Sequence, residues 1–349
     1  MTVVKPPLPA DELASIAERL GPLWNDLDGA HVLLTGGTGF WGTWLLESCL
    51  WVADRQGLDV RLDVLTRDPA RFMARSGHLA SHPRVRLLAG DVTTFAGATP
   101  YSHILHAATD TSGPATREAS LAYFDTLLSG TRAVLEAARP TRARVLLASS
   151  GAVYGPQPRD LTHVPEDFGG GPRLFTADSI YAEGKRAGET LGALAAKVWG
   201  VPVVVARGFA FVGPHLPLDQ HFAIGNFIGD GLLGRPIRVG GDGTPWRSYM
   251  YAADMAVWLW TMLLRGEPGV AYNLGSDEAV TIRDVAGVVG AQTGQPVHVS
   301  CTPVPGVQAL RYVPCIRLAR DTLGLTLVHD VADGIRRTLA WHRSFSVPG

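Results

Sequence analysis

A glycine-rich segment near the N-terminus constrains the fold of this chain more than any other feature. Gly36, Gly39 and Gly42 stand three residues apart, after an apolar run at 31–35 and at the start of a helix-like stretch at 41–53. Glycines at such a turn allow a positive φ, and they let the N–H groups that open a helix approach a pyrophosphate. The segment therefore predicts a dinucleotide site between a strand and a helix, with a purely structural glycine turn as the alternative.

Apolar runs and helix-like stretches alternate along most of the chain. This alternation predicts a parallel β-sheet with helices on both faces. We therefore expect an α/β fold, a Rossmann-like doubly wound parallel sheet with a smaller C-terminal substrate-binding α/β domain. The expected strands are 31–35, 60–66, 85–89, 103–106, 145–149, 201–206 and 271–274, and the expected helices are 11–28, 41–53, 121–138, 180–199, 255–264 and 282–289.

The composition of the chain changes after Phe209, where glycine, proline and aromatic residues become frequent up to Trp246. This change indicates a second, less regular domain. We expect three parts: a helical extension at 1–29, a dinucleotide-binding domain at 30–208 with about 250–290, and a substrate-binding domain at 209–249 and 291–349.

Charge and cysteine content exclude several classes of protein. The 31 basic and 32 acidic residues give a net charge of −1, which argues against a nucleic-acid binder. Three scattered cysteines without a C-x-x-C pair predict neither a disulfide framework nor a metal site. The N-terminus lacks the apolar stretch of a signal peptide, and the apolar run at 255–264 is about half a membrane span. We expect a cytoplasmic protein with no membrane, metal or nucleic-acid partner.

The end of the second expected strand bears on which dinucleotide is bound. NAD sites place an acid there for the ribose 2′-hydroxyl, whereas NADP sites place a basic group near the 2′-phosphate. Here Thr66 stands at the tip and Arg67 follows it, which favours NADP and leaves NAD open. Two alternatives stay open, because Asp68 could turn inward and Arg67 could be a solvated surface charge.

Further cofactor contacts are expected at the carboxyl ends of the neighbouring strands. Asp91 is placed to accept a hydrogen bond from the adenine amine, and His106 is expected to be structural or to line the cofactor. The small residues after His106 let the cofactor lie close to the sheet. The complete expected set is Gly36, Thr38, Gly39, Phe40, Trp41, Gly42, Thr66, Arg67, Asp91, Val92, His106, Ala107, Ala108, Tyr181 and Lys185.

Tyr181 and Lys185 are expected to do the chemistry. Their spacing of four places both side chains on one face of a helix. A nearby ammonium lowers the pKa of a phenol, so the tyrosine can act as a base near neutral pH. Only three of the 31 basic residues are lysines, and an arginine would not substitute well for an ammonium that binds ribose hydroxyls.

A serine at the end of the fifth expected strand completes the predicted catalytic set. Ser150 is expected to donate a hydrogen bond to a substrate oxygen and to pass a proton to Tyr181. Ser149 is the second choice, and the alternative is that both serines only cap the strand.

Taken together, these segments resemble the extended short-chain dehydrogenase/reductase superfamily, in its nucleotide-sugar epimerase and dehydratase branch. The resemblance implies a Rossmann domain that binds NAD(P) and a C-terminal domain that binds a nucleotide-diphosphate sugar. It also implies a homodimer joined by the helices at 121–138 and 180–199. It rests on Gly36–Gly42, Gly90–Val92, His106–Ala108, Ser149–Gly155, Tyr181 with Lys185, Arg207–Pro214, Gly241–Gly243, Arg247–Tyr249, Asp254 and Tyr272–Ser276.

Departures from the family pattern carry information about the reaction. The 4,6-dehydratases have an Asp-Glu pair after the catalytic hydroxyl residue, where this chain has Gly151 and Ala152, which transfer no protons. An asparagine that touches the diphosphate in the family is replaced at Ala210 or Phe211, and another is replaced by Leu127. The resemblance assigns the diphosphate to Arg247 and the substrate to Thr109, Ser150, Gly151 and Asn226, with 110–112 and 218–222 as weaker candidates.

The residues and the resemblance together predict a nucleotide-sugar 4-epimerase that transiently oxidises C4. The alternative is an NADPH-dependent 4-ketoreductase of a deoxysugar nucleotide, which uses the same residues in one direction. A 4,6-dehydratase or a non-catalytic dinucleotide-binding protein fits less well, because the acid pair is missing whereas the tyrosine and the lysine are both present.

Overall fold

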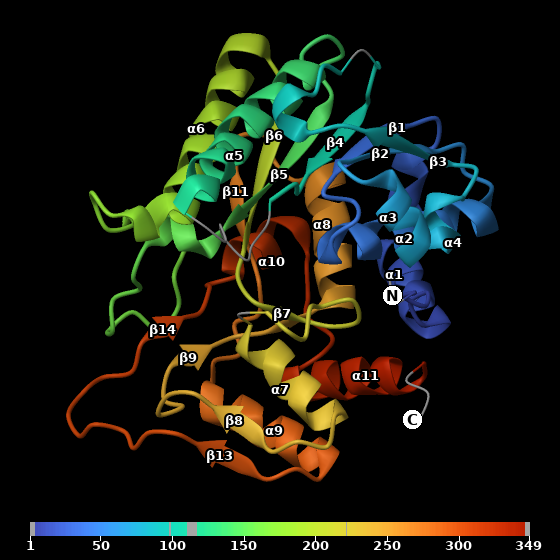
Figure 1. Cartoon of the computed structure of the whole chain (residues 1–349). Coiled ribbons are helices and arrows are strands. Elements are labelled where there is room, and N and C mark those ends of the chain that lie inside the picture. Colours follow the sequence, from blue (N-terminus) through green and yellow to red (C-terminus); the bar gives the residue numbers. More distant parts are fainter. Residues whose placement is uncertain (1–3, 98, 110–116, 221, 346–349) are drawn as a thin grey trace. The chain divides into compact units, whose positions relative to one another are not determined.

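The computed structural model describes residues 4–97, 99–109, 117–220 and 222–345 (Figure 1). They form two compact units. The first comprises Met1–Val153, Pro172–Arg207 and Ala256–Tyr272, and the second comprises Tyr154–Gly171, Gly208–Met255 and Asn273–Gly349. The limits of these units are not those of the expected domains, since residues 1–29 belong to the first unit while 154–171 and 273–290 belong to the second.

A seven-stranded sheet forms the centre of the first unit. The pairings of β1 with β2, β1 with β4, β2 with β3 and β4 with β5 are all parallel. This sheet confirms the expected Rossmann-like fold. In spatial order the strands are β11 (Ala271–Leu274), β6 (Val203–Gly208), β5 (Arg144–Ser150), β4 (His103–His106), β1 (His31–Thr35), β2 (Arg61–Thr66) and β3 (Val85–Ala89).

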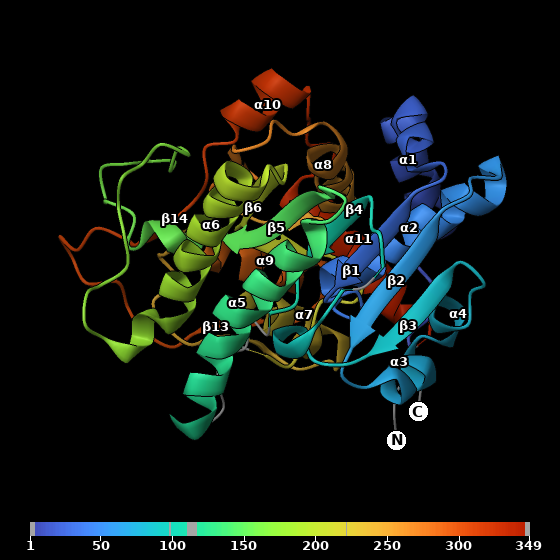
Figure 2. The same cartoon turned by 90° about the horizontal axis from the view of Figure 1, so that it is seen from above.

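Helices cover both faces of this sheet. Seen from above, α5 (Arg117–Ala138) and α6 (Ile180–Trp199) lie side by side on one face, and α2 (Phe40–Gln56) and α8 (Ala252–Arg265) lie on the other (Figure 2). The indole of Trp260 on α8 donates a hydrogen bond to Ser48 Oγ on α2 at 3.1 Å. Two short helices, α3 (Pro69–Arg75) and α4 (Gly77–Ala80), lie between β2 and β3 along the chain.

The N-terminal segment corrects one prediction. The single helix expected over 11–28 is instead the α-helix α1 (Ala10–Leu20) followed by the 3-10 helix η1 (Gly21–Leu27). The α-helix ends there because Gly21 has a positive φ of 47° and Pro22 has no N–H to donate.

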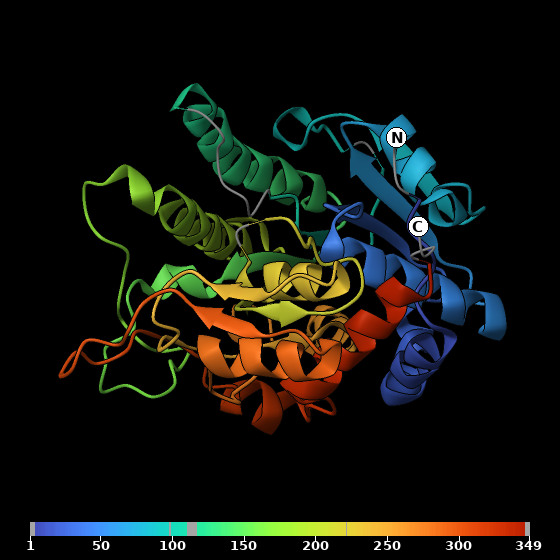
Figure 3. The same cartoon turned by 60° about the horizontal axis from the view of Figure 1, so that its bottom comes forward.

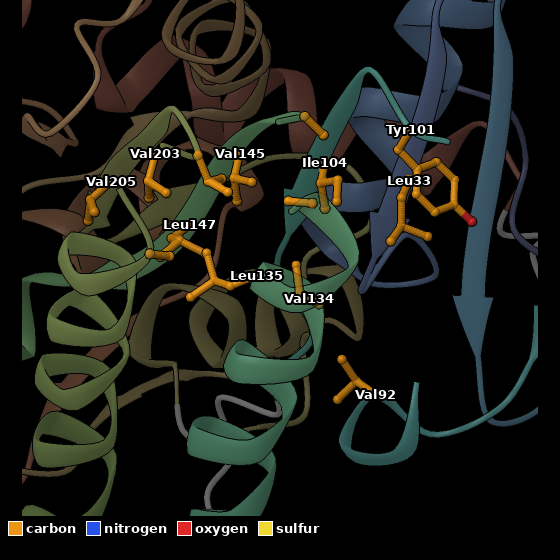
Figure 4. Close-up of a cluster of buried hydrophobic side chains, with 14 of the residues drawn as sticks. Leu33, Val92, Tyr101, Ile104, Val134, Leu135, Val145, Leu147, Val203 and Val205 are labelled. Atoms are coloured by element: carbon orange, nitrogen blue, oxygen red, sulfur yellow. The ribbon is translucent and has the colours of Figure 1, made fainter. Parts of the chain in front are cut away.

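Buried aliphatic side chains fill the space between the sheet and α5 and α6 (Figure 4). The central strands are apolar on both faces, as strands of a parallel sheet covered by helices must be. From the strands come Leu33, Ile104, Val145, Leu147, Val203 and Val205, which meet Val134 and Leu135 of α5.

The second unit combines short strands with a group of helices. β9 (Trp246–Arg247) pairs antiparallel with β12 (Val280–Thr281) and parallel with β14 (Arg311–Tyr312). The helices α7 (Ala223–Leu232), α9 (Ile282–Thr293) and α11 (Val331–Arg343), yellow, orange and red in Figure 3, pack against one another. The remaining elements are β7 (Phe211–Val212), β8 (Ile237–Val239), β10 (Met250–Tyr251), β13 (Val297–Val299) and α10 (Arg317–Leu323).

A buried carboxylate, Asp63 on β2, is satisfied by three side chains of the first unit. It accepts hydrogen bonds from Arg86 Nε at 2.8 Å and from the hydroxyl of Tyr101 at 2.8 Å, and His31 Nε2 lies 3.2 Å away. Burial alone would raise the pKa of Asp63, but these hydrogen bonds hold it below its ordinary 3.8. The charged carboxylate therefore stabilises the fold above about pH 4 and loses this effect as pH falls through the lowered pKa.

We predict that Asp63→Asn lowers the free energy of unfolding by about 2 kcal/mol at pH 7, the range of hydrogen bonds to a charged group. Urea denaturation at pH 7 and at pH 3.5 measures the difference from wild type, which should shrink at the lower pH. The matched control is Asp59→Asn at an exposed position, expected to change stability by less than about 0.5 kcal/mol. A difference that is equal at both pH values would contradict the account.

Candidate active site

The glycine-rich loop runs from the end of β1 to the start of α2. Gly36 has a φ of 74°, and a Cβ there would lie 2.4 Å from the carbonyl oxygen of Ala107, so only glycine fits this approach to the end of β4. At Gly42 a Cβ would lie 2.3 Å from the Cα of Gly37. The N-cap of α2 is Gly39, which offers no side chain to cap the helix. The first N–H groups of α2 are therefore donors at which a pyrophosphate can bind.

The other expected residues of this loop stand at the same place. Phe40 and Trp41 are the first two residues of α2, and both are partly exposed. The carbonyl oxygen of Thr38 accepts a hydrogen bond from the guanidinium of Arg75 at the end of α3. This bond ties α3 to the loop, so the loop and the end of β2 are positioned together.

The carboxyl ends of β2 and β3 adjoin, because the N–H of Gly90 donates to the carbonyl oxygen of Thr66 at 3.1 Å. Asp91 Oδ1 accepts hydrogen bonds from the N–H and the hydroxyl of Thr93, at 2.8 and 2.7 Å. These bonds, together with the charge of Arg67, lower the pKa of Asp91. Asp91 is therefore an ionised acceptor at the edge where the adenosine end of a dinucleotide is expected.

Asp68 is engaged at the start of a helix. It is the N-cap of α3, and its Oδ1 accepts a hydrogen bond from the N–H of Arg71 at 2.8 Å. The neighbouring Arg67 is exposed, and Val92 is buried at the start of the 3-10 helix η2 (Val92–Thr94). The acid that the sequence left open as a ribose ligand thus has a structural partner.

His106 sits in a closed chain of hydrogen bonds at the end of β4. The hydroxyl of Thr131 donates to the carbonyl of Leu127 at 2.7 Å, so Thr131 accepts from His106 Nε2 at 3.2 Å. Thr35 Oγ1, 2.7 Å from His106 Nδ1, accepts from the N–H of Ala108 at 3.3 Å and donates to the ring. Burial and the charge of Lys185 lower the pKa of His106 to about 3. A neutral, fully engaged imidazole fits the expected structural role.

Tyr181, Lys185 and Ser150 come together where α6 crosses the end of β5. The hydroxyls of Tyr181 and Ser150 are hydrogen bonded. Lys185 Nζ donates to the carbonyl oxygen of Ala148 at 2.6 Å and to Thr109 Oγ1 at 3.0 Å, and it lies 5.9 Å from the centre of the Tyr181 ring. One expected substrate residue, Thr109, is thereby placed beside the expected catalytic residues, whereas 110–112 lie outside the described residues.

The pKa values at this site correct one expectation. Burial raises the pKa of Tyr181 above its ordinary 10, and the hydrogen bond with Ser150 opposes this shift. The predicted lowering of that pKa is therefore wrong for the described structure, in which burial is the largest influence on Tyr181 and the ammonium of Lys185 donates to Ala148 and Thr109. Burial also lowers the pKa of Lys185 itself to about 8, and the charge of Glu189 opposes that shift.

The two adjacent serines at the end of β5 have different partners. Ser149 Oγ donates to the carboxylate of Glu189. Ser150 Oγ accepts from the N–H of Ala152 at 3.1 Å, which leaves its own hydrogen for Tyr181 or a substrate. Gly151 and Ala152 open the 3-10 helix η3 (Gly151–Tyr154). The structure thus separates the first and second choices for the catalytic serine.

Two expected substrate residues belong to the second unit, where each is described by its own surroundings. Arg247 on β9 is partly buried, donates to the carbonyl of Trp246 at 2.8 Å and lies 6.0 Å from the ring centre of Tyr312. Asn226 is exposed on α7. The neighbouring candidate 218–222 is described except at 221.

Two charged residues that lie next to expected site residues, Glu189 and Arg311, were not among those predicted from the sequence. Glu189 follows Lys185 by four positions on α6, so the spacing that identified Tyr181 and Lys185 could also have identified it. Arg311 on β14 lies 4.8 Å from the ring centre of Trp246, on the strand that pairs with the one carrying Arg247. That strand is two residues long and shows no local pattern in the sequence.

The parallel sheet, the glycine loop and the Tyr181–Lys185 pair define an NAD(P)-dependent enzyme of the short-chain dehydrogenase/reductase type. The family model described as the NAD-dependent epimerase/dehydratase family matches residues 32–275. The chain belongs to this family.

Known proteins similar to this chain include enzymes with different reactions. UDP-glucuronic acid decarboxylase 1 of Danio rerio is 28% identical over 321 residues, which cover 91% of this chain and 73% of that protein. The structure of dTDP-glucose 4,6-dehydratase from Bacillus anthracis in complex with NAD has a TM-score of 0.75 and 17% identity, over 91% and 97% of the chains. UDP-glucose 4-epimerase of Thermotoga maritima, with UDP-glucose, has a TM-score of 0.74 and 18% identity, over 90% and 99%.

Within the described residues, no helix combines the length and apolar character that crossing a membrane requires.

Proposed function

We propose that this protein is a nucleotide-sugar 4-epimerase that oxidises C4 of its substrate transiently. The observation that carries the proposal is the contact of Tyr181 with Ser150 beside Lys185, followed by Gly151 and Ala152. Hydride transfer at a carbinol carbon needs one acid–base group, one hydrogen-bond donor and a nicotinamide. Removal of water from C5 and C6 needs a further acid and base, for which glycine and alanine have no group.

Bound NAD(P) would supply a nicotinamide ring as the acceptor and donor of the hydride at C4. In its phenolate form, Tyr181 removes the proton from the C4 hydroxyl, and Ser150 donates a hydrogen bond to the same oxygen; because burial raises the pKa of Tyr181, the share of this form grows with pH. We assign the ribose hydroxyls of the cofactor to Lys185, whose ammonium donates to Ala148 and Thr109 in the described structure. A 4-keto sugar that turns about its diphosphate linkage and regains hydride on its other face becomes the C4 epimer.

We assign cofactor binding to the first unit and nucleotide-sugar binding to the second. The glycine loop supports the first assignment, because its N–H groups and backbone approach suit a pyrophosphate. Arg247 supports the second assignment, because a guanidinium suits a diphosphate that can accept two hydrogen bonds. Ala210 or Phe211, at the position of the asparagine usual in the family, leaves this task to arginine.

Decarboxylation of a sugar acid is the second candidate function, favoured by the similarity to UDP-glucuronic acid decarboxylases across 91% of the chain. Its first step is the same oxidation. A ketone at C4 stands β to a carboxylate on C5, and a β-keto acid loses carbon dioxide readily. NADPH-dependent 4-ketoreduction is the alternative that Arg67 favours.

We also propose a homodimer that forms through α5 and α6. Leu121 on α5 and Leu194 and Val198 on α6 are exposed apolar side chains, with 76%, 51% and 68% of their surface accessible. Burying these side chains against a second copy removes apolar area from water.

A panel of UDP-, dTDP-, GDP-, CDP- and ADP-sugars that includes UDP-glucuronic acid tests the proposed reaction, with products followed by NMR. We expect inversion at C4 with no net change at 340 nm. Tyr181→Phe should lower kcat by roughly 100- to 10,000-fold while cofactor affinity changes less than about threefold. Ser150→Ala should lower kcat, whereas the matched control Ser149→Ala should lower it far less.

Unchanged turnover in Tyr181→Phe would reject the mechanism. Loss of carbon dioxide from UDP-glucuronic acid would establish the second candidate instead, and stoichiometric consumption of NADPH would establish the ketoreductase.

The proposed preference for NADP rests on Arg67. Removing a charge-assisted hydrogen bond costs roughly 1.5–3 kcal/mol, so Arg67→Ala should weaken NADP binding by about 10- to 100-fold and change NAD binding little. Titration calorimetry with each cofactor measures both affinities. Arg61→Ala, at the exposed start of β2, is the control and should change neither. Equal loss for NADP and NAD would overturn the preference.

A further inference from the structure

Glu189 extends the catalytic face of α6 by one more turn. Tyr181, Lys185 and Glu189 follow one another at intervals of four residues and therefore share a face of the helix. The carboxylate of Glu189 accepts from Arg207 on β6, with Nη2 at 2.8 Å and Nε at 3.1 Å, and from the hydroxyl of Ser149 on β5. Both charged side chains are largely buried, with 16% and 15% of their surface exposed.

We propose that Glu189, fixed between Arg207 and Ser149, is a positioning residue that supplies the negative charge opposite Lys185 and so keeps its ammonium protonated for catalysis. This inference rests on the proposed function, because it assumes that Lys185 works as an ammonium. Glu189 touches neither the reacting hydroxyls nor the expected cofactor contacts, and it acts through its neighbour on the helix.

Among the described groups around Lys185, Glu189 is the one whose charge opposes the lowering of the Lys185 pKa by burial. Ala148 and Thr109 contribute uncharged oxygens from β5 and from the segment after β4. His106 on β4 is neutral at pH 7, because burial lowers its pKa to about 3. Burial raises the pKa of Tyr181, so the phenol is also neutral there. Among the described residues, the cation of Arg207 also lies near this group, and it is paired with Glu189 itself.

The opposing influences on Lys185 support this assignment. Burial lowers the pKa of Lys185 to about 8, and the charge of Glu189 acts against that shift. Without the carboxylate, the ammonium would therefore lose its proton at a still lower pH. The same carboxylate engages Ser149, which leaves Ser150 as the serine bonded to Tyr181.

The small number of lysines makes a direct test practical. Protein labelled with ¹³Cε-lysine should give three lysine signals, from Lys5, Lys185 and Lys197, and Lys5→Arg and Lys197→Arg assign them. Glu189→Gln keeps an acceptor for Ser149 and removes the charge. We expect the pKa of Lys185 in this variant to fall by at least about half a unit, and the alkaline limb of kcat/KM to move by the same amount.

Two further variants separate charge from structure. Arg207→Gln removes the cation that neutralises Glu189, so the pKa of Lys185 should rise, opposite to the effect of Glu189→Gln. Loosened packing would shift both variants in the same direction. Glu183→Gln removes a charge two positions from Lys185, on another face of α6, and should leave its titration unchanged. Arg207→Gln also provides a test if Glu189→Gln does not fold.

An unchanged pKa of Lys185 in Glu189→Gln, or a fall in Arg207→Gln, would overturn the inference. The titration needs no substrate, so its outcome is independent of whether the proposed reaction occurs. Opposite shifts in a protein that turns over no nucleotide sugar would support the role of Glu189 and count against the proposed function alone.

Discussion

The contact between α6 and the carboxyl end of β5 determines how the candidate catalytic residues of the first unit are arranged. Lys185 on α6 donates a hydrogen bond to the carbonyl of Ala148 on β5, and Ser149 on β5 donates one to Glu189 on α6. Hydrogen bonds therefore join the helix to the strand at two positions one helical turn apart. The helix can come this close because its inner face carries glycines. A Cβ at Gly192 would lie 2.8 Å from Leu147 Cδ1 on β5. Gly184 serves the contact with α5 instead, because a Cβ there would lie 2.4 Å from Leu127 Cδ1. Close packing therefore fixes Tyr181 beside Ser150.

The first unit shows how much of a Rossmann-like fold local sequence can reveal. The runs at 31–35 and 85–89 coincide with β1 and β3. β1 is buried from Val32 to Thr35, as a covered strand of a parallel sheet is, whereas β3 lies at the edge of the sheet, is only partly buried and contains Arg86. The helix at 180–199 coincides with α6. Gly21 and Pro22 also signal the end of the N-terminal α-helix in the sequence. The helical spacing of apolar residues on both sides of them led instead to the prediction of one continuous helix.

The second unit shows what local patterns do not contain. β9 pairs with β12 and with β14, which follow it by more than 30 and more than 60 residues, and each of these strands is two residues long. Such strands are defined by long-range pairing, and two residues show no alternation.

The direction of the pKa shift of Tyr181 was predicted wrongly for a related reason. The spacing from Lys185 suggested a lowered value, whereas burial, which depends on the folded surroundings, raises it.

The described site has few acid–base groups that are not already engaged by other side chains, and this limits the chemistry that it supports. His106 is engaged at both nitrogens, Glu189 is paired with Arg207, and Gly151 and Ala152 follow Ser150. Tyr181, Ser150 and Lys185 are left for the substrate and the cofactor. Together with a nicotinamide as hydride acceptor, this set can support reversible hydride transfer at one carbinol carbon, which is the step that epimerisation, ketoreduction and decarboxylation of a sugar acid have in common.

The path of the hydrogen on C4 is the most direct test of this account. A nucleotide sugar carrying deuterium at C4 would be incubated with the protein and its bound cofactor, quenched, and analysed by mass spectrometry. The account predicts deuterium on the cofactor after a partial turnover, and full retention of deuterium at C4 of the inverted product. Deuterium released into water, or an inverted product formed with no deuterium ever reaching the cofactor, would contradict it.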